Sequence, residues 1–84
     1  MTNTNYHITP DFINAICVQQ RIKLADLYNV LGLDKYFTIT YFYKVLKGSK
    51  PINDRFESVL NAELQGFLST SDLIKVIKIQ ELLK

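Results

Sequence analysis

Apolar residues and glycines follow one another along this chain in a pattern that predicts short helices. Apolar side chains recur three and four positions apart in two central stretches, and each stretch ends at a glycine, Gly32 or Gly48. This spacing places the apolar side chains on one face of a helix. A glycine just past the last apolar residue is the usual left-handed end of a helix. We therefore expect an all-α fold.

Local signals mark where five helices begin and end. Thr9 can cap the first helix and Pro10 suits its first position, while Asn53 can cap the fourth and Ser69 or Ser71 the fifth. Residues 1–8 are polar and lack periodicity, so we expect a flexible arm before a single domain over residues 9–84. The expected helices cover residues 10–20, 23–31, 38–47, from 53 to near Gly66, and 72–83.

The third stretch allows a second interpretation. Residues 36–43, YFTITYFY, are rich in aromatic and β-branched side chains, which favour a strand. We favour a helix, because the neighbouring segments have helical spacing and Gly48 stands where a helix would end. Thr38 would then be the N-cap, and Phe42 and Val45 would face the core.

The composition indicates one small domain without enzymatic chemistry. The 84 residues are 48% hydrophobic, which is enough for a core. Cys17 is the only cysteine, so no intramolecular disulfide forms, and its apolar surroundings predict a buried thiol in a reducing compartment. His7 is the only histidine, and no glycine-rich phosphate loop occurs. We expect no enzyme activity, no metal, no cofactor and no small-molecule substrate. Without a signal peptide or a long apolar run, we expect a cytoplasmic protein with no membrane contact.

The middle of the chain resembles the lambda-repressor-like helix-turn-helix family, the Cro and xre-type phage regulators. Residues 21–32, RIKLADLYNVLG, are similar to the first motif helix and its glycine turn, and residues 37–48, FTITYFYKVLKG, to the second, recognition helix. Residues 47–54, KGSKPIND, are similar to the glycine, basic turn, proline and helix start that follow. The resemblance covers about residues 10–65, with the motif at about 22–48. Family core positions match Ile22, Leu27, Leu31, Phe42 and Val45.

This chain departs from the family at three places. Residues 33–36, LDKY, lengthen the turn between the two motif helices. Tyr28 stands where the family has an alanine at the close crossing of these helices, and Leu24 stands where it often has a glutamine near a phosphate. A tyrosine would block a close crossing unless the longer turn moves the two helices apart.

The resemblance implies that the recognition helix lies in the major groove of operator DNA. A lysine can donate to guanine, a threonine can donate or accept, and isoleucine can touch a thymine methyl group. The positions that match base contacts are Ile39, Thr40, Tyr43 and Lys44. The positions that match phosphate contacts are Thr38, Lys47, Lys50 and Asn53. The lysines can instead be ordinary solvated side chains that complement the helix dipole, and the threonines can serve only as caps and turn residues. The net charge of +2 is too weakly basic to indicate a nucleic-acid partner by itself.

A protein partner is the alternative to DNA. If Phe42 and Val45 face the core, then Ile39, Tyr43 and Leu46 form an outward apolar stripe suited to protein binding. The chain would then be an antirepressor or modulator that engages another repressor and blocks its DNA contact. In the last helix Leu73, Val76, Ile77 and Leu83 share a broad face, whereas Ile74 and Leu82 fall outside it. This helix either completes the core or contributes to a homodimer.

Overall fold

The structure is a computed structural model that describes residues 6–83. Its elements in chain order are α1 (Pro10–Gln20), α2 (Leu24–Val30), the 3-10 helix η1 (Leu33–Lys35), α3 (Ile39–Leu46), α4 (Asp54–Gln65) and α5 (Thr70–Leu82). These described residues contain no β-strand, so the predicted all-α fold with five α-helices is confirmed. The strand alternative for residues 36–43 is wrong.

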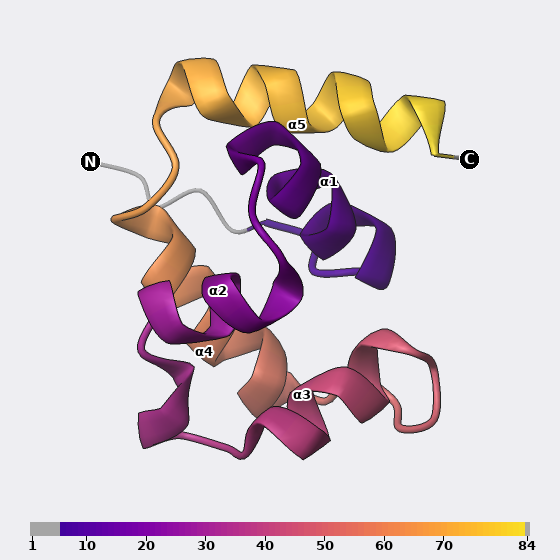
Figure 1. Cartoon of the computed structure of the whole chain (residues 1–84), viewed down its shortest axis with the longest axis vertical. Coiled ribbons are helices and arrows are strands. Elements are labelled where there is room, and N and C mark those ends of the chain that lie inside the picture. The colour runs from indigo at the N-terminus through magenta and orange to yellow at the C-terminus, as the bar shows by residue number, and fades with distance from the viewer. Residues whose placement is uncertain (1–5, 84) are drawn as a thin grey trace.

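Helix α1 lies between α5 and helices α2 and α3 (Figure 1). It packs along α5, and the two helices lie side by side at the top of Figure 1. It also contacts α2 and α3, which contact each other. The segment between α3 and α4 projects at the lower right of Figure 1, away from the α1 and α5 pair. The two ends of the molecule are therefore α5 on one side and α3 with its following loop on the other.

The core draws side chains from every α-helix. The largest side chains that are almost wholly buried are Phe42, Phe56, Ile13, Ile16, Leu27, Leu33, Leu60, Leu64, Val45 and Val76. Ile13 and Ile16 lie three residues apart on one face of α1, and both are fully buried. Val30, the last residue of α2, is apolar but lies outside the core, with 59% of its side chain exposed.

Polar N-caps begin four of the five α-helices. The side-chain oxygens of Thr9, Thr38, Asn53 and Ser69 each accept a hydrogen bond from a backbone N–H three residues later, at 2.8–3.1 Å. These bonds satisfy donors that a helix start leaves unpaired. Because Ser69 rather than Ser71 is the cap, α5 begins at Thr70, earlier than the expected residue 72.

A residue in the left-handed conformation follows each of the helices α1, α2 and α3. Gly32 and Gly48 have φ angles of 66° and 84°, as their position after the apolar residues predicts. After α3, the Ser49 N–H donates to the Lys44 carbonyl at 2.9 Å and the Gly48 N–H to the Val45 carbonyl at 3.2 Å. Helix α1 ends in the same way without a glycine, because Arg21 takes a φ of 58°. A side chain with a Cβ is strained in that conformation.

The expected flexible arm is wrong for residues 6–8. Ile8 is only 2% exposed and belongs to the core, and the Tyr6 ring lies 5.7 Å from the Phe12 ring, measured between centroids. The backbone of Tyr6 is also hydrogen-bonded to Asn61 in α4. The polar, aperiodic sequence of this segment gave no indication that Tyr6 and Ile8 pack against other parts of the fold. The rest of the predicted arm, residues 1–5, lies outside the described residues.

Candidate nucleic-acid interface

The turn between α2 and α3 is organised around Tyr28. The Tyr28 side chain is buried, its ring lies 5.6 Å from the Phe42 ring, and its hydroxyl donates to the Phe37 carbonyl. Residues 33–35 form η1 inside the turn. An aromatic ring therefore lies against α3 at the place where the resembled family has alanine. Residues 33–35 wind into a helical turn, and Phe37 follows within reach of the Tyr28 hydroxyl.

One face of α3 is exposed and polar. Phe42, Val45 and Leu46 are buried, and at about 100° per residue the opposite side of the helix carries Thr40, Lys44 and, at the C-cap, Lys47. All three side chains are exposed. We call Thr40, Lys44 and Lys47 the outward face of α3. It combines one hydroxyl with two cations.

The predicted apolar stripe on α3 is wrong at Leu46. This side chain is only 8% exposed and belongs to the core. It follows Phe42 by four residues, so it lies on the same side of the helix as that buried ring. Ile39 and Tyr43 are half-buried and pack against the core. The buried sector of α3 is thus wider than Phe42 and Val45 alone, and the remaining apolar side chains lie at its edge.

The candidate phosphate contacts lie around the starts of α3 and α4. Thr38, Lys47, Lys50 and Asn53 are all exposed. The Thr38 and Asn53 oxygens cap their helices, and the Asn53 amide nitrogen donates to the Tyr41 hydroxyl at 3.2 Å. That last bond joins the first turn of α3 to the start of α4. The two N-termini therefore lie near each other, and each favours a negative charge.

The segment from Phe37 to Asn53 carries charges of one sign, and acids follow it at Asp54 and Glu57 in the first turn of α4. No acid occurs between Phe37 and Asn53, whereas Lys44, Lys47 and Lys50 all do. Within residues 6–83, none of these three lysines forms an ion pair with a carboxylate. No carboxylate of the described chain therefore holds these three ammonium groups, and an anion can contact them directly.

The remaining interface candidates lie on α5. Ile74 is 52% exposed and Leu82 is 84% exposed, as their place outside the apolar face predicts. Ile77 and Leu83 were expected on that face but are 45% and 47% exposed. They are exposed because α5 buries a narrower strip, centred on Val76, against α1. The dimer contact itself stays a prediction.

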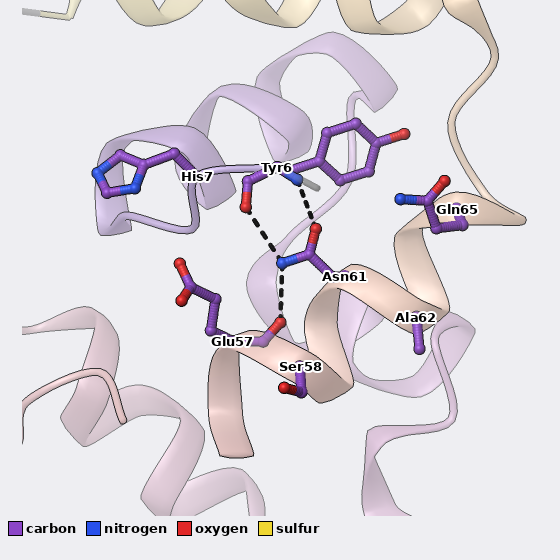
Figure 2. Close-up of a pocket in the computed structure, with 7 residues that line it drawn as sticks. All are labelled: Tyr6, His7, Glu57, Ser58, Asn61, Ala62 and Gln65. Atoms are coloured by element: carbon purple, nitrogen blue, oxygen red, sulfur yellow. Dashed lines mark hydrogen bonds between the residues drawn. The ribbon is translucent and has the colours of Figure 1, made fainter. Parts of the chain in front are cut away.

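A polar hollow of about 720 Å³ lies between the segment before α1 and helix α4 (Figure 2). Asn61 lies at its centre and is 9% exposed. Its amide nitrogen donates to the carbonyls of Tyr6 at 3.1 Å and Glu57 at 3.0 Å, and its oxygen accepts from the Tyr6 N–H. His7 is exposed and takes no part in these bonds. Asn61 thus joins the backbone of Tyr6, in the chain that enters α1, to its own helix α4.

A second, smaller pocket was not predicted from the sequence. It has a volume of about 200 Å³ and is lined by Tyr36, Phe37, Tyr41, Asn53, Arg55 and Phe56. We call it the aromatic pocket. Its aromatic residues come from separate elements and share no periodic pattern, so the only signal in the sequence was the density of aromatic residues from Tyr36 to Tyr43. The sequence did not indicate a role for Arg55 in a pocket, because a single charged residue is common at the start of an amphipathic helix.

Comparisons of the chain with known protein families, with curated proteins and with solved structures found no match in any of the three. None of the helices in the described part of the chain has the length and hydropathy needed to cross a membrane. Among residues 6–83, no three His, Cys, Asp or Glu side chains gather where they could hold a metal ion. The geometry of α3 and its surroundings therefore carries the functional argument.

Proposed function

We propose that this chain is a small transcriptional regulator that binds operator DNA through the outward face of α3. The observation that supports this most is the composition of that face: Thr40, Lys44 and Lys47 point away from the core, and no acid of the described chain pairs with the lysines. Lysine donors suit guanine edges in the major groove, and cations suit phosphates. The lambda-repressor-like resemblance of residues 21–54 supports the same function.

Each side chain has a separate role in this proposal. Lys44 and Thr40 meet base edges, since they lie on the most exposed line of α3, and Ile39 and Tyr43 provide apolar contact from its edge. Lys47 and Lys50 bind phosphates and release counterions. The capped N-termini of α3 and α4, at Thr38 and Asn53, add backbone N–H groups that favour a phosphate.

A binding assay with sequence competitors tests this function. The probe is the DNA duplex directly upstream of the gene that encodes the chain, and the competitor is a shuffled duplex of the same composition. We expect the native chain to prefer the upstream duplex. Lys44→Ala should lose most of that preference, because a base contact is worth about 1–3 kcal/mol of discrimination. Lys78→Ala, at an exposed site on α5, is the matched control and should keep it. Failure of the native chain to shift either duplex at low salt contradicts the proposal.

A second candidate is a protein-binding antirepressor or modulator, and it is favoured by the exposed apolar side chains of α5. Ile74 and Leu82 are large, apolar and unpartnered in the described chain. Contiguous exposed apolar surface marks contact sites between proteins. Its test is a pull-down of a repressor from the source organism with the native chain and with Ile74→Ser. Retention of the repressor by the native chain but not by Ile74→Ser, with no DNA shift, favours this second function over the first.

A further inference from the structure

The aromatic pocket opens between three elements that meet beside the start of α4. Tyr36 and Phe37 come from the segment after η1, Tyr41 comes from the first turn of α3, and Arg55 and Phe56 come from the first turn of α4. Its volume of about 200 Å³ is below the roughly 300–1,000 Å³ of sites for small-molecule ligands. The pocket is thus of a size for one large side chain.

Ring contacts fix the walls of the aromatic pocket. The Phe37 and Phe56 rings stack, with centroids 5.2 Å apart and planes inclined by 22°. The Tyr41 ring lies 5.6 Å from Phe37 and meets Phe56 edge-on at 6.2 Å. Phe56 is itself 1% exposed and belongs to the core. The cavity therefore exists before anything binds, and a partner that enters it does not have to order these side chains.

Arg55 is the only charged residue among those that line the pocket. One terminal nitrogen of its guanidinium donates to the Tyr36 carbonyl at 3.2 Å, which holds the side chain across the rim. No acid of the described residues forms an ion pair with it. Arginine presents five N–H donors in a fork that matches a carboxylate. Several donors therefore remain for an acceptor that arrives with the occupant of the pocket.

The other polar side chains that line the pocket each already take part in a hydrogen bond. The Asn53 oxygen accepts from the Phe56 N–H at 2.8 Å, and its nitrogen donates to the Tyr41 hydroxyl. The Tyr36 hydroxyl donates to Glu63 at 3.2 Å. A nucleobase needs donors and acceptors along its edge, and the pocket offers it only a few donors, which are Arg55, the Tyr41 hydroxyl and the second N–H of the Asn53 amide. An apolar side chain needs none, so these bonds favour an apolar occupant.

We propose that the aromatic pocket binds one large apolar side chain of a partner protein, with Arg55 binding a carboxylate next to that side chain. Buried aromatic or aliphatic anchors beside an arginine are the residues that contribute most to protein interfaces. Among the residues that line the pocket only Arg55 is charged, so its cation favours a carboxylate on the partner segment.

Occupation of the aromatic pocket should also affect DNA binding, and this step rests on the proposed function. Asn53 lines the pocket and is a candidate phosphate contact. A protein segment over the pocket covers the start of α4 and brings negative charge to it. The partner and DNA would therefore exclude each other. Peptide binding to the pocket does not depend on this step.

Short synthetic peptides test the pocket directly. The probe is acetyl-Asp-Phe-Asp-amide, titrated into the full-length chain while the ring resonances of Tyr36 and Tyr41 are followed by NMR. We expect saturable shifts of both rings. Acetyl-Asp-Ala-Asp-amide removes the anchor and acetyl-Lys-Phe-Lys-amide reverses the charge, and both should bind at least several-fold more weakly. Arg55→Gln should weaken binding of the first peptide about tenfold, whereas the control Arg21→Gln should not.

Several results would overturn the proposal. The first is the absence of saturable shifts with the acidic peptide, and the second is binding of the alanine or lysine peptide as tightly as the acidic one. The third is unchanged binding of the acidic peptide by Arg55→Gln. The fourth is tighter binding of thymidine monophosphate than of the acidic peptide. The last would indicate a nucleotide site. A separate titration adds the acidic peptide to the DNA complex. If the chain binds the peptide but shifts no DNA, the proposed function fails while the pocket stands. If it binds both at once, only their mutual exclusion fails.

Discussion

The Tyr28 hydroxyl donates a hydrogen bond to the backbone carbonyl of Phe37, across the turn that separates α2 from α3. The ring of Tyr28 is buried against Phe42. Phe37 in turn stacks on Phe56 and forms a wall of the aromatic pocket. The Tyr28 bond therefore links α2 to this pocket and to the start of α3. A residue that departs from the resembled family thus sets the position of α3.

Removing that hydroxyl should destabilise the protein without unfolding it. Tyr28→Phe keeps the buried ring and deletes only the donor to Phe37, so we expect the free energy of unfolding to fall by about 1 kcal/mol. Urea denaturation measures this. Tyr36→Phe is the matched control, because its hydroxyl is exposed, and it should change stability by less than about 0.5 kcal/mol. Equal effects of the two variants would contradict the role given to Tyr28.

Two substitutions at left-handed residues should act in opposite directions. Arg21 has a φ of 58° and Gly48 a φ of 84°, and a Cβ is unfavourable in this region. A Cβ built on Gly48 meets nothing within 4 Å, so its only effect is on the backbone. Arg21→Gly should therefore raise the free energy of unfolding by about 1 kcal/mol, and Gly48→Ala should lower it by a similar amount. Thermal denaturation of both variants checks the signs, and a shift of both in the same direction would refute the explanation.

Asp72 should make the stability of the protein depend on pH in the acidic range. Hydrogen bonds from the Ser69 backbone and side chain, followed by one from Gln19, hold the pKa of Asp72 below its ordinary 3.8. The folded chain thus favours the carboxylate. The resulting stabilisation is complete above pH 3.8 and is lost as the pH falls through the lower, folded-state pKa. Denaturation of the native chain and of Asp72→Asn from pH 6 to pH 3 should show their difference in stability shrinking on acidification. A constant or growing difference would contradict this.

Cys17 should react slowly with thiol reagents while the protein is folded. Burial, with a smaller contribution from Asp26, raises the pKa of its thiol from 9.0 to about 11. A rise of about two units lowers the thiolate fraction near neutral pH about hundredfold, and the thiolate is the reactive form. Reaction with a disulfide reagent at pH 8 should therefore be at least about hundredfold slower in buffer than in urea. Equal rates would mean that Cys17 is accessible.

Features set by neighbouring residues were predictable from the sequence. The caps Thr9, Thr38, Asn53 and Ser69 bond to N–H groups three residues away, and Gly32 and Gly48 end helices by their own backbone conformation. Because such signals act within one turn, no knowledge of the fold is needed to interpret them.

Features set by packing were not predictable in the same way. Ile8 is buried by contact with residues far along the chain, and Leu46 is buried because the core covers a wider part of α3 than two residues indicate. The aromatic pocket requires Tyr36, Tyr41 and Arg55 to meet from three elements. A linear pattern does not contain these contacts, so the sequence identified the outward lysines but neither the edge of the buried face nor the pocket.

The salt dependence of DNA binding tests the central claim most directly. The measurement is the affinity for the upstream duplex between 50 and 200 mM salt, for the native chain, for Lys47→Gln with Lys50→Gln, and for the control Lys75→Gln with Lys78→Gln on α5. If Lys47 and Lys50 contact phosphates, their loss reduces the slope of log affinity against log salt by about two, whereas the control leaves it unchanged. Equal slopes for all three proteins would contradict DNA binding through the outward face of α3 and the loop that follows it.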